Sequence, residues 1–344
     1  MSSFNIKRRS PYDTYTGVTT ADGTPLSSFG EVNVAELHPA VQGDFIYGIN
    51  SLTFVTTGYV GASVSATGGM ATVNSGTGST GTGQLFFRRK LKYRPGMGSL
   101  VRATCMFDTP VSGNLQLIGA GNTESGYYFG YYGTNFGIIH QENSQRQIMK
   151  LDISTGGGTG TATVTLNGQA ISVPVTGGNL ATQTAYQLTL SNYASTGGGW
   201  TSDVISGSVY FIGGTVGART GSYSISGNGI TGSFTTVVSG NTGTLTFISQ
   251  SSFNIDTIDG NGPSGFKINP QKGNVYQVGY QYLGFGNAFF AVENPNTGRP
   301  TPVHMIKNAN ARTTPVLQNP QSTPRLVSQN IGNTTNVAPK TVSM

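Results

Sequence analysis

The sequence predicts an all-β protein, and three features of its composition lead to that expectation. Glycine contributes 51 of the 344 residues, roughly twice its usual share. Charged residues make up 9% and aromatic residues 10%, whereas disordered chains are rich in charge and poor in aromatics. The longest stretches without glycine or proline are Ile138 to Thr155 and Asn179 to Thr196, which excludes long helices and coiled coils. Short strands joined by Gly, Ser, Thr and Asn turns fit these observations.

The length indicates more than one structural unit, because single cores stop growing near ~250–300 residues. Changes in composition along the chain suggest where the units begin and end. The expected division is an N-terminal arm or opening strand at 1–44, a discontinuous β-sandwich at 45–155 and 244–314, an inserted small α+β module at 156–243, and an extended C-terminal arm at 315–344.

Strand patterns support the sandwich in chain order. Apolar residues alternate in 45–73, in 85–93 with a bulge at Arg88 and Arg89, and again in 100–107. The segment 115–153 consists of four short strand patterns separated by Gly and Asn turns, and a meander of this kind is typical of one face of a sandwich. Alternation of the same character returns after Thr244.

The inserted module contains the strongest local signal in the chain. Two alternating runs flank Asn167 and Gly168, a dipeptide that favours a tight β-hairpin. Residues 180–193 fit a helix, with Leu180, Thr184 and Leu188 on one side, and fit a strand nearly as well. Glycine-rich segments at both ends of the module are typical of linkers.

The segment after residue 314 is rich in proline and polar residues, which predicts an arm that pairs with no sheet of its own chain. Such an arm would be ordered only on a neighbouring subunit. Its apolar residues are spaced widely enough to dock singly on that neighbour: Leu317, Leu326, Val327 and Ile331. We therefore expect a homo-oligomer, with a trimer as the favoured state.

The net charge is +6, and much of it lies in one short stretch. The members of this candidate basic patch are Arg88, Arg89, Lys90, Lys92 and Arg94. Basic residues of this kind protect the edge of a sheet from pairing. They also attract a protein partner or an acidic glycan, whereas nucleic acid is the least favoured of these partners here.

The sequence contains no motif of a known catalytic centre or metal site, such as GxSxG, HExxH, CxxC or a P-loop. The three histidines, His38, His140 and His304, are isolated in sequence, and Cys105 lies in an alternating run typical of a core strand. A single cysteine offers no disulfide within the chain. We therefore expect a protein without catalytic activity and without a cofactor, with calcium as the one exception considered.

The calcium hypothesis concerns the oxygen-rich loop that contains Asp256, Asp259 and Asn261. Loops rich in Asp, Asn and Gly bind calcium, but Ile258 stands where an EF-hand pattern needs another oxygen. The alternative is an Asx-turn loop, in which these side chains bind their own backbone.

A tyrosine cluster provides the candidate contact site for a glycan or protein partner: Tyr127, Tyr128, Tyr131 and Tyr132. Alternation along a strand sends about half of them inward as core residues. The outward half would present flat apolar faces and hydroxyl groups on which a sugar stacks. Core packing or subunit contact is the alternative interpretation.

No stretch of the sequence is apolar enough to span a membrane, and the first ten residues lack the apolar core of a signal peptide. We therefore expect no membrane span and synthesis in a cytoplasm.

Four segments carry a resemblance to known proteins: the stretch from Tyr93 to Gln141, WTSDVISGSVYFI, the stretch from Phe253 to Gly298, and VHMIKNANA. These segments resemble virion structural proteins of large DNA viruses of algae and protists, and related segments of some phage virion proteins. It implies a lectin-like or jelly-roll β-sandwich located in a virus particle, and it transfers no catalytic residue.

The resemblance and the composition together predict a non-enzymatic virion structural protein, such as a minor capsid, vertex, fibre or tail component. We expect it to assemble with copies of itself and with other virion proteins. The alternative is an attachment protein that binds glycans on the host surface, and a polysaccharide-degrading enzyme is a third class that would also be β-rich.

Overall fold

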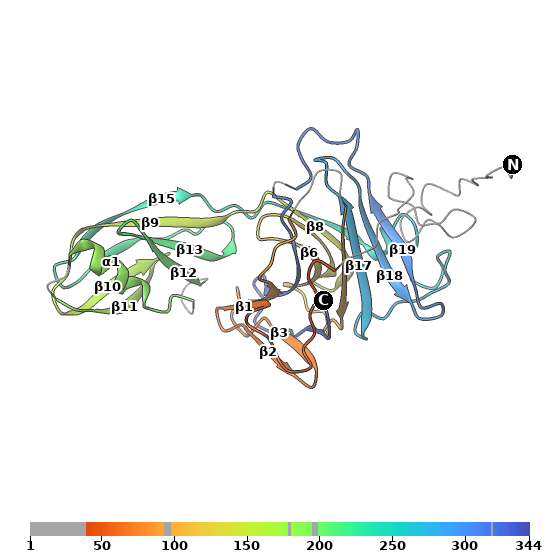
Figure 1. Ribbon diagram of the computed structural model, residues 1–344, viewed down its shortest axis with the longest axis horizontal. Coiled ribbons are helices and arrows are strands. Elements are labelled where there is room, and N and C mark those ends of the chain that lie inside the picture. Colours follow the sequence, from red (N-terminus) through yellow and green to blue (C-terminus); the bar gives the residue numbers. More distant parts are fainter. Residues whose placement is uncertain (1–38, 93–97, 178–179, 195–198, 318) are drawn as a thin grey trace.

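The computed structural model describes residues 39–92, 98–177, 180–194, 199–317 and 319–344. In this part of the chain the regular elements are strands, apart from the helix α1 (Ala181–Thr189) and the single 3-10 turn η1 (Gln250–Ser252). The prediction of an all-β sandwich is confirmed. The strands form two lobes, a larger sandwich and a smaller module that extends to one side (Figure 1).

The main sheet of the sandwich has seven antiparallel strands in the order β1-β4-β20-β6-β7-β8-β16. Their bounds are β1 (Phe54–Tyr59), β4 (Thr82–Phe87), β20 (Thr323–Asn330), β6 (Asn114–Gly121), β7 (Gly126–Tyr132), β8 (Asn135–Glu142) and β16 (Thr244–Ser249). The meander β6-β7-β8 is the one that the turn signals in 115–142 predict, and Gly133, with a φ of 61°, makes the turn between β7 and β8.

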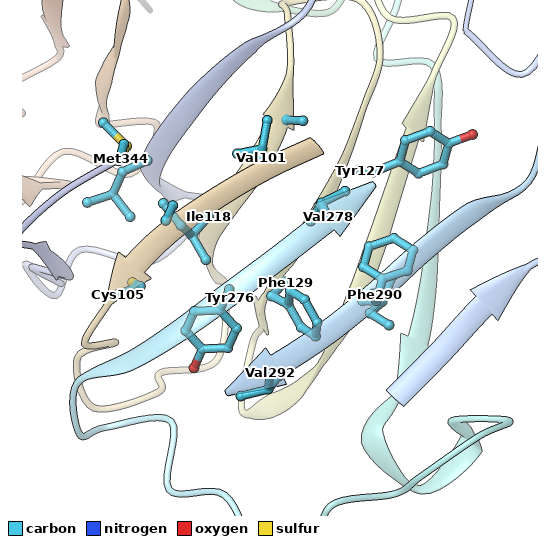
Figure 2. Close-up of a cluster of buried hydrophobic side chains, with 14 of the residues drawn as sticks. Val101, Cys105, Ile118, Tyr127, Phe129, Tyr276, Val278, Phe290, Val292 and Met344 are labelled. Carbon is cyan, nitrogen blue, oxygen red and sulfur yellow. The ribbon is translucent and has the colours of Figure 1, made fainter. Parts of the chain in front are cut away.

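A second antiparallel sheet packs on the main sheet, and its strand order is β19-β18-β17-β5. Its bounds are β5 (Gly98–Cys105), β17 (Asn274–Gln281), β18 (Ala288–Asn294) and β19 (Arg299–Ile306). Figure 2 shows side chains of both sheets meeting in the core: Ile118, Tyr127 and Phe129 come from the main sheet, and Tyr276 and Phe290 from the second. A small third sheet combines β2 (Ser63–Thr67), β3 (Met70–Asn74) and β21 (Lys340–Thr341).

The module has a core of its own between two further sheets, ordered β12-β13-β9-β15 and β11-β10-β14. Its strands are β9 (Arg146–Thr155), β10 (Gly160–Leu166), β11 (Gln169–Val175), β12 (Trp200–Ile205), β13 (Ser208–Val216), β14 (Ser224–Ser226) and β15 (Thr231–Val238). Asn167 and Gly168 form the predicted hairpin turn between β10 and β11. Of the two alternatives for 180–193 the structure has the helix, because Thr184, Ala185 and Leu188 of α1 are buried on one face.

The boundary at residue 155 was wrong. Strand β9, which the sequence analysis assigned to the sandwich, pairs with β13 and β15. Its buried residues Met149 and Leu151 belong to the core of the module. The change in composition lies in the glycine-rich loop that follows β9. The chain leaves the sandwich earlier, near Ser144, between β8 and β9.

The prediction of a C-terminal arm on a neighbouring subunit was also wrong. Strand β20 lies inside the main sheet, between β4 and β6 of the same chain, and Leu326 is fully buried. Asn330 donates its backbone N–H to the carbonyl of Gly81, on the side of β4. Backbone N–H groups alternate in direction along a strand, so an N–H at position 324, six residues earlier, would point to the same side. Pairing with β4 begins only at Arg325, one residue after Pro324. The proline therefore costs the sheet no hydrogen bond.

The remaining apolar residues of the predicted arm are divided between core and surface. Leu317 and Val327 are buried in this chain, and only Ile331 is substantially exposed, at 48%. Residues 1–38 of the predicted N-terminal arm lie outside the described part of the chain. Residues 43 and 44 pair with the C-terminal residues Ser343 and Met344.

Candidate functional site

The tyrosine cluster is not the exposed platform that sequence analysis considered. Tyr127, Tyr128 and Tyr131 are buried, and only Tyr132 reaches solvent, at 45% exposure. Tyr127 and Tyr131 point into the core between the two sheets, whereas Tyr128 belongs to a separate cluster of buried apolar residues. The reason is that both faces of β7 are covered, so alternation does not divide its side chains into core and surface.

The basic patch is largely exposed, as expected. Arg88, Arg89, Lys90 and Lys92 are exposed in the segment that follows β4, while Arg94 lies outside the described residues. The Arg88 guanidinium donates to the carbonyl of Ser51 at 3.1 Å. In the described part of the chain the salt bridges involve none of these four side chains. Their charges are therefore available to an anionic partner, whereas they protect no sheet edge, because β4 lies between β1 and β20 inside the main sheet.

The acidic loop uses its carboxylates to hold its own backbone. Asp256 is buried and accepts hydrogen bonds from the backbone N–H groups of Ile258 and Ser264, both at 2.8 Å. Asp259 accepts from the Asn261 backbone at 2.9 Å and from the Thr257 hydroxyl at 2.8 Å. Among the described residues there is no group of three or more acidic, His or Cys side chains placed to hold a metal. This geometry supports the Asx-turn interpretation.

Sequence reasoning missed a buried polar cluster at the end of β8. The ring of His140 stacks on Tyr127 with 4.4 Å between centroids, and its Nε2 lies 3.3 Å from the carbonyl oxygen of Val316. Glu142 accepts a hydrogen bond from the guanidinium of Arg312. Arg312 and Val316 lie 170 and 176 residues from Glu142 and His140 and share no motif with them, so only the fold brings the two segments together.

Burial sets the protonation states in this cluster. Burial, assisted by the nearby charge of Arg312, lowers the pKa of His140 to about 4, although the hydrogen bond to the Val316 carbonyl acts in the opposite direction. Burial also raises the pKa of Glu142, whereas the charge and the hydrogen bond of Arg312 act to lower it. His304 is a second buried histidine: its Nδ1 accepts from the Asn254 backbone, and burial lowers its pKa to about 4. Both rings are neutral at pH 7 and shielded from solvent, which suits a structural role.

The module is joined to the sandwich at a compact junction. Gln145 and Asn241 exchange two backbone hydrogen bonds, of 2.7 and 2.9 Å, where the chain enters and leaves the module. Tyr59, at the end of β1, is buried against Gly199 and Gly214 of the module, where the ring occupies the space that side chains would fill. The junction therefore has two attachment points, the Gln145–Asn241 pair and Tyr59 at the end of β1.

Three exposed large apolar side chains of the module lie on α1 or at its ends. Leu180, Tyr186 and Leu190 are 71%, 57% and 69% exposed. Tyr186 and Leu190 line an open hollow of about 450 Å³ together with Thr182, Gln183 and Gln187, whereas Leu180 precedes the helix and does not line the hollow. Figure 1 places α1 at the side of the module far from the sandwich. No charged side chain lines this hollow among the described residues.

No protein-family model matches the chain, and no curated protein matches it. Within the described residues no helix is long and apolar enough to cross a bilayer.

Proposed function

We propose that the protein is a non-enzymatic structural component of a virus particle that assembles with copies of itself through its projecting module. The sequence resemblance supports a location in a virus particle. The division into a sandwich and a projecting module supports assembly with copies of the same chain. The module has its own hydrophobic core and extends to one side of the sandwich (Figure 1). Its outer surface is therefore not needed to complete the sandwich and can contact a neighbouring molecule.

The observation that carries the proposal is the outer face of α1. Two large apolar side chains, Tyr186 and Leu190, are more than half exposed there and share one hollow, and Leu180 at the start of the helix is also exposed. Contiguous exposed apolar residues mark interaction sites on soluble proteins. The face also lacks charge, which matters because the chain carries a net charge of +6 and copies repel each other wherever like charges meet. A second copy of the chain is therefore the favoured occupant.

The assembly is tested by the mass of the purified protein in solution. We expect an oligomer, with a trimer as the favoured state, and we expect Leu180→Ser combined with Leu190→Ser to shift it towards monomers at matched concentration. The matched control is Tyr47→Ser combined with Leu52→Ser, since these side chains are 100% and 84% exposed on the sandwich. A monomeric wild-type protein, or equal dissociation of both double variants, would contradict self-assembly through α1.

The location in a particle is tested separately. An antibody against the purified protein should label intact, density-purified particles of the virus that encodes it, and the protein should remain with them after washing in high salt. Its presence only in the lysate of infected cells would overturn the proposal.

A second candidate function, attachment to acidic glycans on a host surface, is favoured by the exposed basic stretch after β4. Binding to an array of sulfated and sialylated glycans should then be lost in Arg89→Glu combined with Lys90→Glu. Lys272→Glu combined with Arg299→Glu changes the same charge at other exposed positions and should bind normally. Release of reducing ends from a polysaccharide would instead favour a degrading enzyme.

A further inference from the structure

The loop that precedes β1 presents three large apolar side chains to solvent. Ile46, Tyr47 and Leu52 are 65%, 100% and 84% exposed. Among the described residues no other large apolar side chain is as exposed as Tyr47 or Leu52. Single exposed apolar residues are common on proteins, whereas a group of them within one short loop indicates a contact surface.

The base of this loop is fixed to the core of the sandwich. Phe45 and Phe54 flank the loop, are almost fully buried, and have ring centroids 4.8 Å apart. The ring of Phe87 in β4 lies beside Phe54, with 4.5 Å between centroids. Gly48 donates its backbone N–H to the carbonyl of Phe45 at 3.0 Å, which closes a tight turn. The three buried rings fill the space beneath the loop, so its apolar side chains point outward as a group.

The basic stretch after β4 is attached directly to this loop. The backbone N–H of Arg88 donates to the carbonyl of Thr53 at 2.9 Å and thus extends the pairing of β4 with β1 by one residue. The Arg88 guanidinium donates to the carbonyl of Ser51, inside the loop, at 3.1 Å. The first positive charge of the stretch therefore lies on the loop itself.

The rest of the basic stretch is held on its other side. Leu91 donates its backbone N–H to the carbonyl of Ser322 at 2.8 Å, and its side chain packs against the core of the sandwich. Arg89 and Lys90 lie between this contact and Arg88, and both are exposed. The charges are thus kept near the apolar side chains of the loop.

Positive charge dominates this surface. The side chains of Arg88, Arg89, Lys90 and Lys92 are exposed, and the salt bridges of the described chain include none of them. Within 41–54 and 82–92 the one acidic residue is Asp44, whose carboxylate accepts a hydrogen bond from the Ile46 backbone at 3.1 Å. The surface therefore combines apolar side chains at its tip with an excess of positive charge beside them.

We propose that the loop 46–52 and the basic segment 88–92 form a docking surface for an anionic lipid bilayer. Aliphatic side chains enter the boundary of the hydrocarbon region, tyrosine is favoured at the level of the headgroups, and Lys and Arg side chains pair with lipid phosphates. Binding strength grows with both the apolar area inserted and the charge attraction. The contact is with the face of the bilayer, and it is independent of self-assembly through α1.

Other partners satisfy only part of this surface. An acidic glycan would pair with the charges of the basic segment, but it offers no apolar phase for Ile46 and Leu52. A second copy that met the same surface across a two-fold axis would bring its own four positive charges against these. An anionic bilayer complements the apolar side chains and the charges together.

The charge requirement is tested by co-sedimentation of the full chain with vesicles. We expect binding to phosphatidylcholine vesicles that contain about one third phosphatidylserine, little binding to phosphatidylcholine alone, and weaker binding at high salt. Arg89→Gln combined with Lys90→Gln should lower the affinity for the mixed vesicles roughly 30-fold. Lys272→Gln combined with Arg299→Gln removes the same charge at other exposed positions and should bind like the wild type. No binding of the wild type to the mixed vesicles would overturn the proposal.

The apolar requirement separates a bilayer from a partner that needs charge alone. Ile46→Ser combined with Leu52→Ser should lower the affinity for the mixed vesicles roughly 10- to 100-fold, because two apolar side chains no longer leave water. The matched control is Ile205→Ser combined with Val237→Ser on the module, where the side chains are 53% and 50% exposed. Equal vesicle binding by the loop variant and the wild type would exclude the loop as a docking surface.

Insertion is measured with a tryptophan placed in the loop. The one tryptophan of the chain, Trp200, is fully buried in the module, so Tyr47→Trp adds a second, exposed fluorophore. Lipids brominated near the headgroup should quench this added emission in the mixed vesicles and should leave that of Tyr186→Trp, on α1, unchanged. Absence of quenching at position 47, or binding to sulfated glycans without binding to vesicles, would overturn the lipid assignment.

Discussion

Met344 and Gly43 exchange two backbone hydrogen bonds, of 3.0 and 3.1 Å. The side chain of Met344 is only 6% exposed and belongs to the core of the sandwich. The C-terminal segment thus supplies an interior strand of the main sheet, β20, and its last residue is hydrogen-bonded to Gly43 near the start of the described chain. The sandwich is complete only when both ends of its sequence are in place.

The burial of β20 predicts a large difference between two apolar residues of the C-terminal segment. Leu326→Ala should lower the free energy of unfolding by about 2–5 kcal/mol, because Leu326 is fully buried between the sheets. Ile331→Ala, only five residues later, removes a half-exposed side chain and should change it by less than about 0.5 kcal/mol. Urea unfolding measures both values. Similar small losses for the two variants would mean that β20 contributes no buried core.

Two glycines in strands should respond differently to alanine. A Cβ at Gly130 of β7 would lie 1.9 Å from the carbonyl oxygen of Gln116 in the neighbouring strand. Gly130→Ala should therefore destabilise the sandwich by about 1–3 kcal/mol or more, because the backbone of β6 must move. At Gly98 of β5 the nearest atom is 3.6 Å away, so Gly98→Ala is the matched control and should be nearly neutral. Equal unfolding midpoints for the two variants would contradict this packing of β6 on β7.

The buried histidines predict that stability falls as the pH is lowered. Burial lowers the pKa of His140 and of His304 to about 4 in the folded protein, against about 6.5 in the unfolded chain. The unfolded state therefore takes up protons first as the pH falls below about 6.5, and stability is lost down to about pH 4, below which both states are protonated. Each histidine contributes up to about 3 kcal/mol to this loss.

A histidine variant separates this effect from the titration of carboxylates in the same range. Glu142 lies 3.7 Å from Nε2 of His140, and its charge is compensated by Arg312. His140→Gln should reduce the difference in unfolding free energy between pH 7 and pH 4, whatever its stability at pH 7. An unchanged pH dependence in this variant would show that His140 does not remain neutral in the folded state.

The junction predicts where the module can be removed. Gln145 and Asn241 are hydrogen-bonded to each other in both directions, so a short Gly-Asn bridge should replace residues 146–240 and leave a sandwich that unfolds cooperatively. The deletion variant should also carry Tyr59→Thr, because removal of the module would expose the Tyr59 ring, which packs against Gly199 and Gly214.

Deletion of 157–243 is the informative comparison for the junction. It keeps β9 but removes β13 and β15, so the buried side chains of Met149 and Leu151 become exposed beside unpaired backbone. We expect this variant to aggregate, as size-exclusion chromatography would detect. A soluble, cooperative 157–243 deletion together with an insoluble 146–240 deletion would place the boundary at the end of β9 instead.

The sequence by itself determined the local elements, because their signals lie within a few residues of each other. The frequency of glycine and the alternation of apolar residues determined the all-β class, and Asn167 and Gly168 determined the hairpin β10-β11. The turns of the meander β6-β7-β8 were likewise readable from Gly and Asn positions.

The tertiary structure decided every feature that depends on a partner far along the chain. Whether Tyr128 is exposed depends on what covers the second face of β7, and whether Pro324 is tolerated depends on where β4 begins to pair. The polar cluster at the end of β8 joins His140 to Val316 and Glu142 to Arg312, pairs that are 176 and 170 residues apart in sequence. Such contacts are set by the packing of one sheet or lobe against another, and local periodicity carries no information about that packing.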